Sequence, residues 1–320
     1  MATLSATGPP SLGDGELSKR LVTYLSVRLT SSAARTTIPT GRNVRLEVVT
    51  ARRQVPVELT GKVALITGGS NGIGAASARR LAERGARLVI ADIDADQGKV
   101  VADEVGGVFV RCDVTDPADS ASAVEVAVRE FGGLDIAFLN AGIGTGCSLG
   151  DDFDVELYRR AMAINLDGVV YGVHAALPAL RASGGQIIAT ASMAGLMPMP
   201  GDPVYGANKA AVVGLVRALG GAYTDVRVNA LCPAFADTNI ITPLRSTLED
   251  IGMPILPVSA VVDTFMSIVE GSGTGEAWFV QAGRASEPFG FRNPPGPRAA
   301  DGSRVGAASL DPVSIALKES

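Results

Sequence analysis

Two side chains that could move a proton lie one helical turn apart. Tyr205 and Lys209 are four positions apart in a stretch with helical character, so they share one helix face. A tyrosine hydroxyl ionises near pH ~10, and a close ammonium group would lower that pKa by favouring the phenolate. Ser192 ends the strand-like run before this helix, and ligands bind at strand ends in open α/β sheets. An exposed helical pair with no chemical role would show the same spacing, so the trio needs a ligand site beside it.

A glycine-rich turn offers such a site. Residues Thr67–Gly74 read TGGSNGIG and lie between an apolar strand-like run and a helical segment. We expect Gly68 to permit a tight turn, Gly72 to let the backbone approach a pyrophosphate, and Gly74 to let the helix pack closely on the strand. The helix N-terminus would then present unpaired N–H groups to phosphate. A plain flexible loop is the alternative, and the strand–turn–helix context favours the phosphate site.

An acidic residue ends the second strand-like run. Asp92 follows Gly74 by eighteen residues, close to the ~20-residue offset of an acid that binds a ribose 2′-hydroxyl. The same carboxylate would repel a 2′-phosphate, and residues 67–74 contain no lysine or arginine. The pattern therefore predicts NAD rather than NADP, with a solvated strand-end acid as the alternative.

Apolar runs and helical segments alternate from about residue 57 to 285. The expected strands are 62–67, 87–92, 108–112, 135–140, 186–192, 226–232 and 276–281. The expected helices are 75–84, one that starts at 116–119, 153–182, 203–221 and 259–270. In the second of these, one face is expected to carry Val124, Ala127, Val128 and Phe131. This alternation predicts a single-domain α/β fold of the Rossmann type, a doubly wound parallel sheet with helices on both faces.

Both ends of the chain differ from this core. Within residues 1–56, the stretch from Lys19 to Arg53 carries eight basic residues and one acid, and we expect a disordered extension, with an organellar transit peptide as the alternative. Residues 286–320 are rich in glycine and proline and are expected to form a loose tail.

Composition excludes several classes of protein. The net charge of −5 disfavours nucleic-acid binding, because no basic excess is available to neutralise phosphates. Three widely spaced cysteines and a single histidine predict neither a disulfide framework nor a metal site, and favour the cytoplasm. Glycines and prolines interrupt the long uncharged stretch 182–201, so we expect no membrane span.

Taken together, the core resembles the short-chain dehydrogenase/reductase family. The matching segments are 67–74, 112–114 (CDV), 140–142 (NAG), 164–166 (INL), Ser192, 205–209 and 227–233 (RVNALCP) with Thr238. Within the family, the sequence looks most like the NAD-dependent branch that includes 15-hydroxyprostaglandin dehydrogenase-like enzymes. The family's Pro-Gly is Pro233-Ala234 here, and the last strand lacks the common Val-Asp-Gly-Gly ending.

The resemblance implies a role for each catalytic residue. Tyr205 would be the acid/base, Lys209 would hold the nicotinamide ribose and favour the phenolate, and Ser192 would donate a hydrogen bond to the substrate oxygen. Asn165 would hold a water that relays protons from Lys209, unless it merely bonds its own helix backbone.

The resemblance also implies a set of cofactor-binding residues. Asp113 and Val114 would border the adenine, Asn140 would stabilise the sheet beside the cofactor, and Thr238 would touch the nicotinamide carboxamide. The whole implied set is Gly68, Ser70, Asn71, Gly72, Ile73, Gly74, Asp92, Asp113, Val114, Asn140, Ala141, Gly142, Tyr205, Lys209, Pro233 and Thr238.

Apolar residues are expected to wall the substrate site, unless they pack the core or an oligomer interface. They are Cys147, Met193, Leu196, Met197, Met199, Phe235, Ile240, Ile241 and Leu244, the last four within an expected mobile lid at 234–257. We therefore expect an NAD-dependent oxidoreductase that interconverts an apolar secondary alcohol and its ketone by hydride transfer, as a homodimer or homotetramer. The alternatives are a nucleotide-binding sensor or assembly protein without turnover, and an isomerase or lyase on the same fold.

Overall fold

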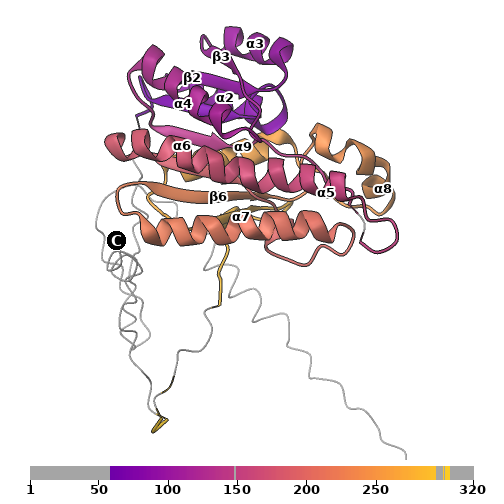
Figure 1. The fold of residues 1–320 in the computed structure, drawn as a ribbon. Coiled ribbons are helices and arrows are strands. Elements are labelled where there is room, and N and C mark those ends of the chain that lie inside the picture. Colours follow the sequence, from indigo (N-terminus) through magenta and orange to yellow (C-terminus); the bar gives the residue numbers. More distant parts are fainter. Residues whose placement is uncertain (1–57, 148, 293–297, 299, 303–320) are drawn as a thin grey trace, which may run out of the picture. The chain divides into compact units, whose positions relative to one another are not determined.

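The chain folds around a twisted, mostly parallel sheet (Figure 1). The computed structural model describes residues 58–147, 149–292, 298 and 300–302. Within them, the strand order is β3-β2-β1-β4-β5-β6-β7-β8, and each neighbouring pair is parallel except β7 and β8. The strands are β1 (Val63–Thr67), β2 (Arg87–Asp92), β3 (Val108–Arg111), β4 (Ile136–Leu139), β5 (Gln186–Thr190), β6 (Arg227–Pro233), β7 (Ala277–Val280) and β8 (Glu287–Pro288). The predicted doubly wound fold is confirmed.

Two hydrophobic cores lie on opposite faces of the sheet. In β4, Ala137 and Leu139 belong to one core, and Ile136 and Phe138 belong to the other. Such strands are buried on both faces, which explains why their sequences are apolar throughout rather than alternating. The ring of Phe138 packs on that of Phe265 with centroids 4.4 Å apart.

Helices cover both faces. The α-helices are α2 (Gly72–Glu83), α3 (Ala95–Glu104), α4 (Pro117–Phe131), α5 (Val155–Met162), α6 (Gly168–Ser183), α7 (Pro203–Ala222), α8 (Arg245–Asp250) and α9 (Val258–Glu270). Helices α4, α6 and α7 pack on one core, whereas α2, α3 and α9 pack on the other. Figure 1 shows α6 and α7 as two long helices, with strand β6 visible between them in this view.

Helix α3 was not expected from the sequence. Asp94 caps its N-terminus and accepts a hydrogen bond of 3.1 Å from the backbone N–H of Gln97. Gly98 in its interior would ordinarily disfavour a helix. Here a side chain at Gly98 would collide with the ring of Phe109 in β3, so close packing against the sheet requires the glycine.

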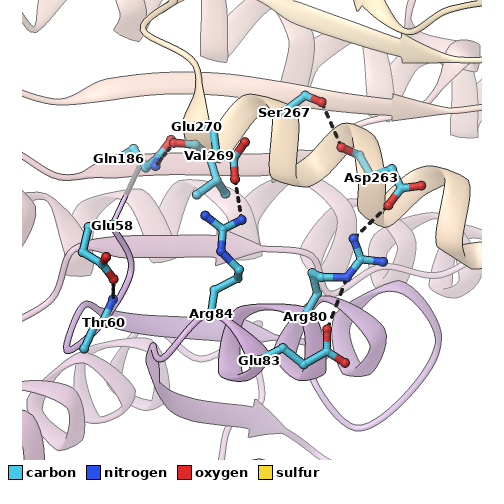
Figure 2. Close-up of polar contacts among 10 residues, drawn as sticks. All are labelled: Glu58, Thr60, Arg80, Glu83, Arg84, Gln186, Asp263, Ser267, Val269 and Glu270. Carbon is cyan, nitrogen blue, oxygen red and sulfur yellow. Dashed lines mark hydrogen bonds and ion pairs between the residues drawn. The ribbon is translucent and has the colours of Figure 1, made fainter. Parts of the chain in front are cut away.

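Ion pairs join α2 to α9. Arg80 contacts Asp263 at 2.9 Å and Arg84 contacts Glu270 at 2.6 Å, as Figure 2 shows. The Gln186 amide at the start of β5 donates to the carbonyl of Val269 at 3.1 Å, which fixes the end of α9 against the sheet. Exposed pairs of this kind contribute less than about 1 kcal/mol each, so they set the register of the two helices more than their stability.

Helices α5 and α6 form one continuous helical segment, Val155–Ser183, with one turn of π-helix (Ala163–Asp167) between them. Among the described residues, one helix is long and apolar enough to cross a membrane when judged by length and composition alone. It is this segment, whose mean hydropathy is 1.2. Its residues Val169, Val173 and Leu180 lie in the core beneath the sheet. Packing within the domain accounts for the apolar character of this helix.

The sheet continues past residue 285, where a loose tail was expected. Strand β8 pairs antiparallel with β7, and the N–H of Phe289 donates to the carbonyl of Ala277 at 2.8 Å. Phe291 packs against the core, and the Arg217 guanidinium lies over its ring, 3.8 Å from the ring centroid. Residues 1–56 and most of the expected tail lie outside the described residues.

One further expectation needs correction. Val128 is 45% exposed rather than on the buried face of α4, and Val126 is buried in its place. The face of α4 that meets the sheet is therefore rotated from the predicted one.

The segment 234–257, the expected mobile lid, contains the 3-10 helix Asn239–Leu244 and α8. Its mobility stays a prediction.

The Phe291–Arg217 contact predicts that the C-terminal segment stabilises the domain. We expect Phe291→Ala to lower the free energy of unfolding by about 2 kcal/mol, through lost burial and a lost cation–π contact. Phe153→Ala is the matched control, since that ring is 42% exposed and pairs with Tyr158 rather than with Phe291, and should cost less than about 1 kcal/mol. Urea unfolding followed by tryptophan fluorescence measures both, and equal effects would contradict an anchoring role for Phe291.

Candidate active site

The residues singled out from the sequence converge at the carboxyl ends of the central strands. The glycine turn follows β1, Asn140 follows β4, Ser192 follows β5, and Pro233 ends β6. Strands β1 and β4 are neighbours, and the chain runs outward in opposite directions from them. Such a switch point opens a crevice that binds ligands in α/β sheets.

The glycine turn is built so closely that side chains would not fit. Gly68 has a φ of +62°, and a Cβ there would lie 2.8 Å from the Cα of Ala141. A Cβ at Gly74 would collide with the carbonyl oxygen of Gly68. Gly72, the first residue of α2, has a φ of +51° and faces Thr238, whose Cγ2 would lie 3.2 Å from an added Cβ.

Residues around this turn fit a dinucleotide. Asn71 caps α2 through its side-chain oxygen, and Ser70 and Ile73 flank it on the partly exposed side of the turn. The turn has no side chain at Gly68, Gly72 or Gly74, so a ligand can approach the backbone N–H groups at the start of α2. This arrangement suits a pyrophosphate.

Asp92 lies beside the glycine turn, as predicted. One carboxylate oxygen accepts hydrogen bonds from the N–H and the hydroxyl of Ser70, at 3.0 and 2.6 Å. The other oxygen accepts from the N–H of Asp94 at 3.0 Å. The protein therefore holds a carboxylate at the edge of the crevice, in a fixed orientation.

Asp113 and Val114 lie beyond β3 in a rigid turn. The Asp113 carboxylate accepts hydrogen bonds from the hydroxyl and the N–H of Thr115, at 2.7 and 3.0 Å, which hold the pKa of Asp113 below its usual range. Val114 is buried against Gly168, where an added Cβ would lie 2.8 Å from a Val114 methyl group. This turn therefore keeps its shape without a ligand.

Asn140 links three strands. Its side-chain N–H₂ donates to the carbonyls of Thr67 and Gly68, at 3.3 and 3.2 Å, and its side-chain oxygen accepts from the Thr190 hydroxyl at 3.0 Å. The Thr67 hydroxyl accepts from the N–H groups of Asn140 and Ala141. Both ends of the Asn140 amide are thus engaged within the protein, which favours the structural role over direct cofactor binding.

Lys209 is a buried ammonium group with 3% of its surface exposed. Its Nζ donates to the carbonyl of Thr190 at 2.9 Å and lies 5.7 Å from the ring centroid of Tyr205. Burial lowers the pKa of Lys209 to about 8. Gly142 lines the space beside it, since an added Cβ would lie 3.4 Å from the same Nζ.

Tyr205 and Ser192 meet, as the sequence predicts. The Ser192 hydroxyl accepts from the N–H of Ala194 at 3.1 Å and donates to the carbonyl of Pro233 at 3.4 Å. In this structure burial raises the pKa of Tyr205 from its ordinary value, and the opposing hydrogen bond with Ser192 does not compensate. The lowering expected from Lys209 together with a bound nicotinamide ring stays a prediction.

Asn165 is completely buried in the π-helical turn. Its oxygen accepts from the N–H of Ile143 at 2.9 Å, and its nitrogen donates to the carbonyl of Ile143 at 3.0 Å and to the side-chain oxygen of Asn208 at 3.2 Å. The side chain braces the segment after β4, rather than bonding its own helix. Its role in holding a water stays a prediction.

Four further residues belong to this site and were not singled out from the sequence. They are Thr190, Asp202, Asn208 and Cys232. Burial raises the pKa of the Cys232 thiol to about 12, so this thiol is neutral beside Lys209. Only Asp202 had a sequence signal, because an aspartate directly before a proline is typical of a helix start.

The expected substrate walls separate into two groups. Cys147 and Ile241 are buried, whereas Ile240, Leu244 and Met197 are 43%, 46% and 56% exposed. A hollow of about 540 Å³ is lined by residues 194–200 with Pro203, Gly206, Ala207 and Ala210 of α7. These α7 residues occupy a different helix face from Tyr205 and Lys209, so this hollow is not the catalytic crevice.

The buried Lys209 predicts a cost to stability. Below pH ~8 the folded protein must hold an ammonium group away from water, and the unfolded chain keeps its proton up to the ordinary pKa of 10.5. The folded state therefore binds fewer protons between these values, and this residue's destabilising effect should fade as the pH rises through that window. We expect Lys209→Met to raise the free energy of unfolding at neutral pH by about 2 kcal/mol, even though the Thr190 carbonyl loses its donor.

Denaturant unfolding at pH 7 and pH 10 tests this expectation. Lys99→Met is the control, because Lys99 is exposed on α3. A Lys209→Met protein that is less stable than the parent at neutral pH would show that the ammonium is well solvated or paired.

Comparison with known proteins identifies the family of the chain. Residues 62–249 match the family model described as short chain dehydrogenase. The chain is 38% identical over 224 residues to short-chain dehydrogenase reductase ATA1 of Arabidopsis thaliana, covering 67% of this chain and 81% of that protein. It is 38% identical over 200 residues to the cyclohexanol dehydrogenase of an Acinetobacter species, covering 60% and 78%.

A solved structure has the same fold. It is the 3-ketoacyl-(acyl-carrier-protein) reductase of Brucella melitensis in complex with NADH, with a TM-score of 0.66 and 32% identity, covering 71% of this chain and 99% of that one. These relatives do not single out the 15-hydroxyprostaglandin dehydrogenase-like branch, so that placement stays a prediction. The chain belongs to the short-chain dehydrogenase/reductase family, whose members are oxidoreductases that use a nicotinamide cofactor.

Proposed function

We propose that the protein is an NAD-dependent oxidoreductase that interconverts an apolar secondary alcohol and its ketone, with Tyr205 as acid/base. The observation that carries this proposal is the meeting of Ser192, Tyr205 and Lys209 beside the glycine turn. The name of the cyclohexanol dehydrogenase relative supports a cyclic or apolar alcohol as the substrate class.

The residues divide the chemistry between them. A bound nicotinamide cofactor would supply the two-electron redox chemistry. The Tyr205 hydroxyl exchanges a proton with the substrate oxygen, and Ser192 forms a hydrogen bond to the same oxygen. Because burial alone raises the pKa of Tyr205, proton acceptance needs a nearby positive charge, and the Lys209 ammonium supplies one 5.7 Å from the ring centroid.

Asp92 supports the preference for NAD. Its carboxylate is fixed by Ser70 and Asp94 at the position expected for the adenosine ribose. A 2′-phosphate placed there would meet a negative charge at short range, whereas a 2′-hydroxyl could donate a hydrogen bond to it. The NADH in the Brucella melitensis reductase is consistent with this preference.

We also propose that a second copy of the chain covers the outer face of α7, in a homodimer or homotetramer. The exposed positions on that face are small, namely Ala207, Ala210, Ala211, Gly214 and Ala218. Arg217 is the charged exposed residue of the helix, and the apolar hollow beside α7 continues the same surface. A cytoplasmic location is proposed as well, since Cys112, Cys147 and Cys232 are all buried and form no disulfide with one another.

The proposed acid/base role predicts that Tyr205→Phe abolishes turnover while cofactor binding survives. Phenylalanine keeps the ring and its packing but cannot exchange a proton. NADH formation from a panel of alcohols, including cyclohexanol, hydroxysteroids and hydroxy fatty acids, is followed at 340 nm, and NAD affinity is followed by calorimetry. Near-normal turnover by the variant would exclude Tyr205 as the acid/base.

The proposed selector role of Asp92 predicts that Asp92→Ala weakens NAD binding and relaxes the discrimination against NADP. Loss of one ribose hydrogen bond to a charged acceptor should cost about 1.5–3 kcal/mol of NAD affinity. Asp94→Ala is the matched control, since Asp94 lies beside Asp92 but caps α3. An unchanged ratio of kcat/KM for the two cofactors would refute Asp92 as the selector.

A further inference from the structure

Asp202 makes three hydrogen bonds that join two separate parts of the site. It lies immediately before α7, and its Oδ1 accepts from the backbone N–H of Tyr205 at 3.0 Å. The same oxygen accepts from the hydroxyl of Thr145, and Oδ2 accepts from the N–H of Gly146 at 2.9 Å. One carboxylate therefore caps the helix that carries Tyr205 and also holds the loop after β4.

The loop that Asp202 holds, residues 143–147, runs past the reacting groups. It begins next to Gly142, which lines the space beside the Lys209 ammonium. At Gly144 an added Cβ would lie 3.8 Å from a methyl group of Ile240 in the 3-10 helix of the 234–257 segment. The loop thus stands between the catalytic helix and the segment expected to close over substrate.

Two fixed points hold this loop, and Asp202 supplies one of them. Asn165 binds both backbone groups of Ile143 at the loop's start. At the other point, Thr145 is 3% exposed, and Gly146 adopts a left-handed φ of +56° with its N–H directed at Asp202. Hydrogen bonds to a charged acceptor are stronger than neutral ones, so the second point depends on the carboxylate.

We propose that Asp202 is a positioning residue that fastens loop 143–147 to the start of α7 and so fixes the substrate wall relative to the Tyr205 hydroxyl. The proposal rests on the proposed function, because it assigns the loop a place in substrate binding. A residue that only caps α7 would need only the hydrogen bond from Tyr205. The further hydrogen bonds from Thr145 and Gly146 are what a residue that also fastens the loop requires.

Two substitutions separate fastening from capping. Asp202→Ser keeps a good helix cap, but serine is too short to reach the loop as well. Thr145→Val removes the loop's hydroxyl and leaves the cap untouched. Asp116→Ser is the matched control, since Asp116 caps α4 through one bond of 2.8 Å to the N–H of Ala118.

The kinetic test uses the full-length protein and the best alcohol from the panel. We expect Asp202→Ser and Thr145→Val each to lower kcat/KM for the alcohol roughly tenfold. The effect should lie mainly in KM, because a displaced substrate wall weakens binding of the alcohol. The double variant should be no worse than the poorer single variant, since both remove the same contact. NAD affinity, and the kcat/KM of Asp116→Ser, should stay within about twofold of the parent.

Hydrogen–deuterium exchange gives a readout that does not depend on turnover. The backbone N–H of Gly146 should exchange faster in Asp202→Ser and in Thr145→Val, and at the parental rate in Asp116→Ser. If both variants keep the parental exchange rate and the parental kcat/KM, the proposal is overturned. It is also overturned if the losses in kcat/KM of the two single variants multiply in the double variant. A parent protein without turnover on any alcohol would overturn the proposed function and the positioning role together, whereas an active parent with unaffected variants would overturn the positioning role alone.

Discussion

The amide of Asn140 joins the glycine turn to the groups that would move the proton under the proposed function. Its nitrogen holds the carbonyls of Thr67 and Gly68, and its oxygen holds the Thr190 hydroxyl. The carbonyl of that same Thr190 receives the Lys209 ammonium. Hydrogen bonds therefore connect the glycine turn, through Asn140 and Thr190, to the helix of Tyr205, and the partly buried Asn140 amide has partners for both its nitrogen and its oxygen.

This arrangement places a charge where water is scarce. Among the described residues, Lys209 has no carboxylate partner and is held by a neutral carbonyl. A counter-ion would stabilise the ammonium, but it would also cancel the positive field that the proposed acid/base role of Tyr205 requires. Under the proposed function, the site would therefore give up stability to keep a positive charge near Tyr205, a pattern expected where catalytic groups are held ready for reaction.

Much of the fold and of the site could be predicted from the sequence because local and long-range signals agree there. The glycine turn follows β1, Asp92 ends β2 and Ser192 comes just after β5, and the apolar runs of these strands are clear in the sequence. Parallel strands bring such ends to the same edge of the sheet. Helix α3 could not be predicted because Gly98 disfavours a helix on its own. The reason for the glycine is the Phe109 ring packed against it, which only the structure shows. Strand β8 was missed because its two residues carry no period and its partner strand lies in another segment.

The effect of burial on the pKa of Tyr205 could not be predicted from the sequence. Spacing shows that a lysine is near, but it does not show how much water both groups lose, and burial raises this pKa more than Ser192 lowers it. Asn165 illustrates the same limit, since its partners Ile143 and Asn208 are set by packing between elements far apart in the chain.

The short antiparallel strand at the end of the sheet has a consequence for solubility. Without β8, the backbone groups on the outer side of β7 would face solvent as a template for strands of other molecules. Strand β8 occupies part of that edge, and its Pro288 contributes no N–H to the outer side. In the folded chain, the C-terminal segment therefore shortens the open edge of β7 that strands of other molecules could pair with.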